Sequence, residues 1–109
     1  MRKWRRDARW GMANKPLKVA KVKAALGELP GWKFQRDALA KTYTFETFRE
    51  ALGFMVRVGF EAEALNHHPE WTNVYNRVSI RLYTHDAGDK VTAKDVQLAK
   101  KISAIAWVK

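Results

Sequence analysis

The sequence contains no cysteine among its 109 residues. This absence excludes disulfide bonds, a thiolate nucleophile, and zinc or iron–sulfur sites that depend on thiolates. It is compatible with a reducing cytosol, so a cytoplasmic location is expected. No run approaches the roughly 20 apolar residues that a membrane-spanning helix needs, and the N-terminus lacks the apolar stretch of a secretory signal. Only three prolines and six glycines occur, so long structureless linkers are not expected.

The positive charge is unevenly distributed. The chain carries 21 Lys/Arg and 11 Asp/Glu, a net charge of +10, yet residues 1–33 hold ten of the basic and only two of the acidic residues. Residues 1–14 contain the densest basic run together with Trp4 and Trp10, and a basic arm with aromatic residues can bind nucleic acid. A charge run alone is more often a solvated tail. We therefore expect a poorly ordered extension over residues 1–14, a single domain over 15–109, and no nucleic-acid or membrane partner.

Seven secondary-structure elements are predicted after the basic segment. Hydrophobic residues make up 47% of the chain, which supports a packed core. Spacings near 3.6 residues predict helices over 17–29, 45–66 and 92–108, and alternation predicts strands over 32–36, 39–45, 71–75 and 78–84. Short connections within each strand pair favour antiparallel pairing. The expected fold is an α+β two-layer sandwich of order α-β-β-α-β-β-α, in which three helices cover one face of a four-stranded antiparallel sheet.

The long predicted helix and the last one carry specific expectations. The predicted buried stripe of the long helix comprises Phe48, Leu52, Met55 and Ala62, with Phe45 and Val56 beside it. Thr44 is its expected N-cap, and Gly53 and Gly59 would allow another element to approach closely. Thr92 and Asp95 have the spacing of a capping box at the start of the last helix.

All three histidines fall within nineteen residues, at His67, His68 and His85. Glu63 precedes His67 by four residues, so both share a helix face, and His85 ends the strand that pairs with the strand after His68. The three imidazoles should therefore meet at one edge of the sheet. Histidine titrates near neutral pH, which suits proton transfer. Trp71 and Tyr75 lie nearby in sequence and are expected to wall a flat cavity.

The residues alone leave three interpretations of this cluster open. A metal site built from Glu63 and the three histidines would suit zinc or iron, but its spacing matches no established motif such as H-E-x-x-H. A structural role would use a histidine to cap helix carbonyls, with His68 and Pro69 marking a turn. Metal-free acid–base catalysis is the third interpretation, and the spacing favours it. A serine nucleophile is disfavoured, because the only serines, Ser79 and Ser103, lack a nucleophile-elbow context.

A combination of motifs resembles the pterin-4a-carbinolamine dehydratases. The signature is Glu63, Asn66, His67, His68 and Pro69, followed by Tyr75, His85 and Asp95, and the resemblance also takes in Leu29-Pro30-Gly31-Trp32 and Thr84-His85-Asp86-Ala87-Gly88. It implies the same α+β fold. It further implies dehydration of 4a-hydroxytetrahydropterin to quinonoid dihydropterin, which recycles the pterin used by aromatic amino-acid hydroxylases. By this resemblance the reaction requires no metal and no other cofactor.

The resemblance also assigns roles to individual residues. His67 and His85 would form the acid–base pair, and His68 would contact the pterin and share the proton transfer. Glu63 would orient a histidine or polarise the substrate. The implied substrate-binding residues are Asn66, His67, His68, Tyr83, Thr84, His85 and Asp86, to which Trp71 and Tyr75 are added as neighbours in sequence. Pro69 and Asp95 would support the site, Asp95 by capping the last helix.

The same resemblance and the open sheet lead to expectations about the partners of the chain. Some members of the family act as dimerisation cofactors for a transcription factor or as assembly factors, so a non-catalytic binding module is the alternative function. An open four-stranded sheet has exposed edges, which symmetric pairing across an edge or through the long helix would cover. A homodimer or homotetramer is therefore expected, with a small-molecule pterin as the substrate and a hydroxylase as a possible member of the same pathway.

Overall fold

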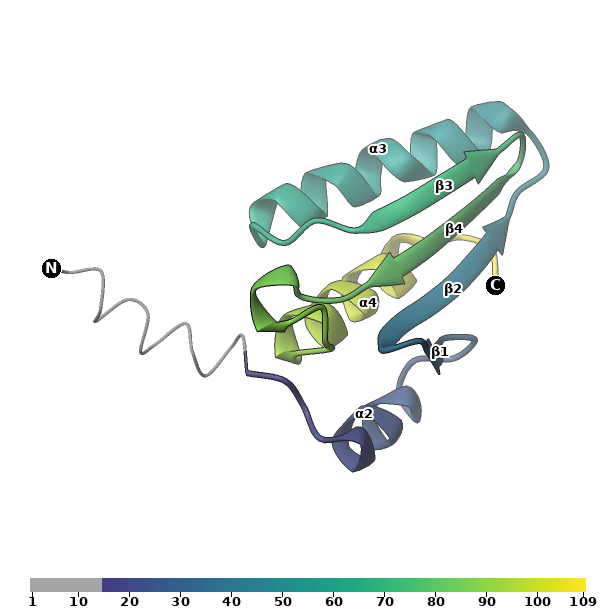
Figure 1. Ribbon diagram of the computed structural model, residues 1–109. Helices are drawn as coiled ribbons and strands as arrows, with labels where there is room; N and C mark the ends of the chain where they lie inside the picture. Colours follow the sequence, from purple (N-terminus) through teal and green to yellow (C-terminus); the bar gives the residue numbers. More distant parts are fainter. Residues whose placement is uncertain (1–14) are drawn as a thin grey trace, which may run out of the picture.

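The computed structural model describes residues 15–109 and places them in two layers (Figure 1). The elements are α2 (Val19–Leu26), β1 (Lys33–Gln35), β2 (Ala38–Thr44), α3 (Phe48–Ala64), β3 (Glu70–Val74), β4 (Arg77–Leu82), a 3₁₀ helix η1 (His85–Ala87) and α4 (Ala93–Ile105). This order confirms the predicted α+β sandwich. The predicted poorly ordered extension over residues 1–14 lies outside the described residues. Within residues 15–109, no helix is both long and apolar enough to cross a membrane.

The sheet consists of two hairpins joined through their later strands. Its order is β1-β2-β4-β3, and every pair is antiparallel. In the central pair, Leu39 lies opposite Leu82 and Tyr43 opposite Val78. The turn between β1 and β2 uses Arg36 and Asp37, which both have positive φ, 49° and 59°, as a tight hairpin turn requires. The turn predicted at residues 37 and 38 is therefore shifted by one residue.

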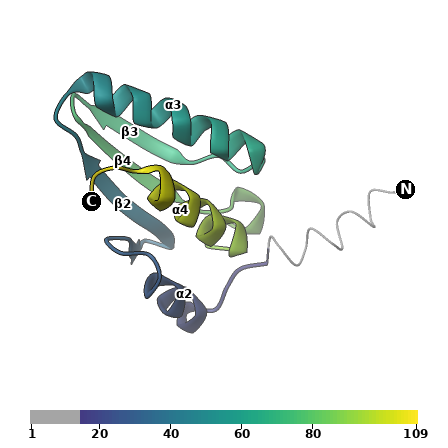
Figure 2. The same ribbon diagram turned by 180° about the vertical axis from the view of Figure 1, so that it is seen from behind.

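The hydrophobic core lies between one face of the sheet and the helices. Figure 2, which views the molecule from the helix side, shows α3 and α4 next to each other in front of the sheet, and α2 contacts the edge strand β1. On β4, Val78, Ile80 and Leu82 are all buried, which confirms the alternation predicted for this strand. Other buried side chains include Leu39 and Tyr43 from β2, Phe54 and Val58 from α3, and Leu98 and Ile102 from α4.

The predictions for the start of α3 and for its buried face are both wrong. The helix begins at Phe48, and its N-cap is Thr47, whose hydroxyl accepts a hydrogen bond from the Glu50 N–H; Thr44 is still part of β2. The buried stripe consists of Ala51, Phe54, Val58 and Ala62, so only Ala62 of the predicted stripe is fully buried. Met55 is partly buried against the core, and Phe45, predicted beside the stripe, is buried but precedes the helix. The helix has apolar residues on two faces, and helical periodicity does not tell which face meets the sheet.

The second apolar face of α3 points to solvent. This outer face consists of Phe48, Leu52, Val56 and Phe60, which recur every four residues, and the first two are 46% and 47% exposed. A Cβ atom added at Gly53 or Gly59 would meet nothing within 4 Å, so the expectation of a closely packed element at these glycines is wrong for the described residues. The single chain thus leaves a large apolar surface on its longest helix.

Candidate active site

A cavity of about 410 Å³ opens where α3 ends and where β4 leads through η1 toward α4. All three histidines line it, as the sequence predicted for the edge of the sheet. The complete lining is Asn66, His67, His68, Pro69, Glu70, Tyr83, Thr84, His85, Asp86 and Lys94. Seven of the residues expected to bind or act on substrate therefore lie together, along with the supporting Pro69.

The C-terminus of α3 separates the two adjacent histidines. Asn66 adopts a left-handed conformation with φ 52°. The N–H of Asn66 donates to the Glu63 carbonyl at 3.0 Å, and the N–H of His67 donates to the Ala62 carbonyl at 3.0 Å. These are the two hydrogen bonds of a Schellman motif, with asparagine in the place usually taken by glycine. The turn places His67 in a buried position and leaves His68 exposed, and Pro69 then prevents the helix from continuing.

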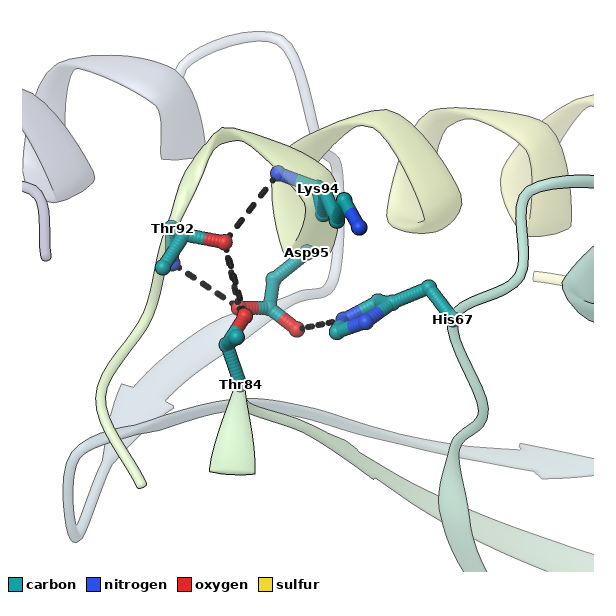
Figure 3. A network of polar contacts seen from close by, with 5 residues as sticks. All are labelled: His67, Thr84, Thr92, Lys94 and Asp95. Atoms are coloured by element: carbon teal, nitrogen blue, oxygen red, sulfur yellow. Dashed lines mark hydrogen bonds and ion pairs between the residues drawn. The ribbon is translucent and has the colours of Figure 1, made fainter. Parts of the chain in front are cut away.

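His67 is held by a buried carboxylate at the start of α4. Its Nε2 lies 2.5 Å from Oδ1 of the fully buried Asp95 (Figure 3). The other carboxylate oxygen accepts hydrogen bonds from the Thr84 hydroxyl and the Thr92 N–H, both at 2.8 Å, which confirms the predicted capping box. An ionised Asp95 can only accept a hydrogen bond, so the contact then requires a proton on Nε2, and in a neutral ring Nδ1 would be the acceptor. Asp95 therefore fixes both the orientation and the tautomer of His67.

The other two histidines are exposed, and each also faces a carboxylate. The His68 Nε2 lies 2.9 Å from Glu63 Oε1, and the His85 Nδ1 lies 3.0 Å from Asp89 Oδ1. The side chains of His68 and His85 are 60% and 89% exposed. Each ring thus has one nitrogen paired with a carboxylate, and the other nitrogen makes no hydrogen bond within residues 15–109, so it can exchange a proton with a bound molecule or with water. Glu63 acts on the cavity through His68 rather than by lining it.

Glu70 and Lys94 line the cavity although the sequence analysis did not select them. The Tyr83 hydroxyl donates to Glu70 Oε1 at 2.7 Å, and Arg81 Nη1 lies 3.2 Å from Oε2. The hydrogen bond from Tyr83, followed by that from Arg81, lowers the pKa of Glu70, and the same bond to Glu70 raises the pKa of Tyr83. The sequence held a signal for each residue: Glu70 follows Pro69 directly, and Lys94 lies inside the Thr92–Asp95 capping box.

Trp71 and Tyr75 do not line the cavity, which corrects the expectation that they wall it. Trp71 lies opposite the buried Ile80 in the sheet register, and it packs against the core. Tyr75 occupies the turn between β3 and β4, with a positive φ of 53°, and is largely exposed. Both residues follow the histidines closely in sequence, but β3 carries the chain away from the C-terminal end of α3 (Figure 1).

The four residues considered for a metal site do not converge on one point. His67 pairs with Asp95, His68 with Glu63, and His85 with Asp89. Across residues 15–109, no group of three or more histidine, cysteine, aspartate or glutamate side chains has an arrangement that could hold a metal ion. The arrangement is three separate imidazole–carboxylate pairs around one cavity.

Comparisons with known proteins show which family the chain belongs to. The family described as pterin 4 alpha carbinolamine dehydratase matches residues 15–105. A protein of Opitutus terrae provisionally named a pterin-4-alpha-carbinolamine dehydratase is 65% identical over 92 residues, which cover 84% of this chain and 95% of that protein. A similarly named protein of Solibacter usitatus is 49% identical over 90 residues, covering 83% and 94%. The crystal structure of a transcriptional coactivator/pterin dehydratase from Brucella melitensis superposes with a TM-score of 0.79 at 40% identity, covering 84% of this chain and 99% of that one. The chain therefore belongs to the pterin-4a-carbinolamine dehydratase family.

Proposed function

We propose that this chain dehydrates 4a-hydroxytetrahydropterin to quinonoid dihydropterin by acid–base catalysis with its histidines, and that it serves tetrahydropterin recycling. The observation that carries the proposal is the convergence of His67, His68 and His85 on one cavity, each with a carboxylate partner. Membership of the family and the names of its relatives support the substrate class.

The reaction requires two coordinated proton movements and nothing else. The hydroxyl on C4a accepts a proton and leaves as water, N5 gives up its proton, and a double bond forms between C4a and N5. In this proposal His67 and His85 exchange these protons with the substrate, while His68 contacts the pterin ring. Glu63 orients His68, and Asp95 orients His67. Each positioned acid or base contributes about 10²–10⁴-fold to the rate.

The experiment is a stopped-flow measurement of 4a-hydroxytetrahydropterin breakdown above the uncatalysed rate. His85→Ala removes an exposed ring and should leave the fold intact. His67→Gln is preferred to alanine, because an amide can still donate a hydrogen bond to the buried Asp95. Each variant should lower the enzymatic rate about 10²–10⁴-fold, and a chelator should leave the wild-type rate unchanged.

Tyr75→Phe provides the matched control, because it changes an exposed side chain that does not line the cavity. Its rate should equal that of the wild type, and circular dichroism should show that all variants fold. Full activity in both histidine variants would contradict the proposed mechanism. A wild-type protein that does not accelerate the breakdown at all would overturn the proposed activity and leave the binding-module alternative.

We also propose that the chain forms a homodimer or homotetramer through the outer face of α3. Four large apolar side chains are exposed there in one row, and at 1.5 Å per residue they extend about 18 Å along the helix. Arg49 lies near one end of the row and Glu63 near the other, with Val56 midway between them in sequence. An antiparallel pairing of two α3 helices about Val56 would therefore place Arg49 of each copy near Glu63 of the other. The same face would be the docking surface if the alternative function, a non-catalytic binding module, held.

A further inference from the structure

A second cavity, of about 440 Å³, lies on the core side of β2, away from the histidines. Its walls come from the loop after α2 and from the C-terminal part of α4 with the residues that follow it. The lining is largely apolar and comprises Pro30, Gly31, Tyr43, Ala106 and Val108, with Lys41, Ser103 and Lys109 as its polar members. Its size falls within the usual range for small-molecule sites.

Lys41 supplies a cation that is fixed in the wall of this cavity. It lies two residues from both Leu39 and Tyr43 along β2, so its side chain is on the same, core-facing side of the strand. Its Nζ donates to the Pro30 carbonyl at 2.9 Å and lies 4.6 Å from the centre of the Tyr43 ring. Gly31, with φ 84°, makes room for it, because a Cβ there would lie 2.7 Å from Nζ. Partial burial lowers the pKa of Lys41.

Tyr43 supplies a buried hydroxyl that has no partner among the described residues. The residue is 1% exposed. Burial raises the pKa of Tyr43. The nearby polar groups of Ser103 and Trp32 offset part of this rise, although neither has the geometry of a hydrogen bond to the Tyr43 hydroxyl. Ser103 accepts a hydrogen bond from the Trp32 indole at 2.9 Å, so the Ser103 hydroxyl keeps its own proton to donate.

The polar groups of the cavity are therefore mostly donors. Lys41 retains two N–H groups after its bond to Pro30, and Tyr43 and Ser103 each retain an O–H. An unpartnered buried donor is unfavourable, and a molecule that accepts its proton would relieve the deficit. We infer that this cavity is a binding site for a small carboxylate with an apolar body, whose charged end meets Lys41 and Ser103 and, through a small shift of the Tyr43 ring, the Tyr43 hydroxyl. The inference does not depend on the proposed dehydratase activity.

The test uses benzoate as the probe. Its binding is observed through the Trp32 indole N–H resonance in ¹H–¹⁵N NMR spectra of the full chain. Benzoate should shift this resonance in a saturable way at millimolar concentration. Benzamide has the same shape without the charge, and acetate has the charge without the apolar body, so both should bind more weakly. Lys41→Met should weaken benzoate binding about tenfold to a hundredfold, and Tyr43→Phe about two- to tenfold.

Lys101→Met is the matched control for loss of a lysine, because Lys101 lies on α4 but does not line the cavity. It should leave benzoate affinity unchanged. Tyr43→Phe should also raise the unfolding midpoint of the unliganded protein, because it removes a buried donor without a partner. Equal binding of benzoate and benzamide would overturn the inference, as would unchanged benzoate affinity in both cavity variants. A benzoate shift at the His85 ring but not at Trp32 would place the ligand in the histidine cavity and would also overturn it.

Discussion

Asp95 joins the capping of α4 to the placement of His67, because one carboxylate serves both. Oδ1 faces the His67 ring, and Oδ2 accepts from Thr84 and from the Thr92 backbone. In Asp95→Asn, the amide group has only one acceptor oxygen, so at least one buried donor loses its partner. We expect the free energy of unfolding to fall by about 1–3 kcal/mol, measured by urea denaturation.

The matched control for this change is Asp37→Asn, which alters an exposed carboxylate paired with Lys90 on the surface. It should change stability by about 0.5 kcal/mol or less. The rate of the proposed dehydration should also decrease in Asp95→Asn, since one amide oxygen cannot hold both the His67 ring and the donors at the start of α4 as the carboxylate does. Equal stability of the two variants would show that the buried network contributes less than its geometry implies.

The hydrogen bond between Tyr83 and Glu70 can be tested by an acid titration. The hydrogen bond from Tyr83 is the largest cause of the lowered pKa of Glu70. In Tyr83→Phe, the Glu70 pKa should therefore rise toward its ordinary value, as followed by the side-chain carboxyl ¹³C shift during an acid titration. Because the pKa of Glu70 is lowered in the folded chain, its ionised form stabilises the fold at pH values above its ordinary pKa. This stabilisation is lost as the pH falls through the folded-state pKa. An unchanged Glu70 pKa in Tyr83→Phe would mean that Arg81 dominates instead.

Helix α3 carries two glycines in its interior, and its geometry predicts that replacing Gly53 with alanine stabilises the fold. Gly53 lies in open space, so alanine there should raise the free energy of unfolding by about 0.5–1 kcal/mol through the lower entropy of the unfolded chain. Gly31→Ala is the opposing comparison, because φ is 84° there and the new Cβ would meet Lys41. It should lower stability. Thermal unfolding of the two variants should therefore give shifts of opposite sign.

The elements show what periodicity can and cannot predict. The alternation of Val78, Ile80 and Leu82 identified the buried face of β4, because a strand in a two-layer fold has only one face to bury. The same reasoning failed for α3, where Phe48 and Leu52 gave as good a helical stripe as Phe54 and Val58. Local sequence does not determine which stripe meets the sheet, since that depends on how the strands set the helix orientation.

The candidate site likewise has features that the sequence predicts and features that it does not. Convergence of the three histidines could be predicted, because short connections on both sides of β3 and β4 leave few alternatives. The buried Asp95–His67 bond could not, because it joins residues 28 positions apart through the packing of α4. The expectation that Trp71 lines the cavity was wrong, because proximity to the histidines in sequence does not put a strand residue in the wall of their cavity. Sequence therefore indicated the chemistry of the site better than its supporting contacts.

At the scale of the whole molecule, the outer face of α3 leads to the proposed assembly. Val56 lies at its centre and is 50% exposed, and Val19 on α2 is 52% exposed. A glutamate at position 56 would place a charge in the middle of an apolar interface, which is strongly unfavourable when the charge has no partner. In light-scattering measurements at micromolar concentration, the wild type and Val19→Glu should be dimers or tetramers, and Val56→Glu should dissociate to smaller species.

Charge reversal tests the orientation of the paired helices separately. If two α3 helices pair antiparallel about Val56, Arg49→Glu brings like charges together at both ends and should weaken association. Combining it with Glu63→Arg restores opposite charges across the interface and should recover association, especially at low ionic strength. Recovery in the double variant would be specific to the antiparallel arrangement, because a parallel pair would keep each residue near its own counterpart. A monomeric wild type, or a Val56→Glu variant that assembles as well as Val19→Glu, would refute this interface.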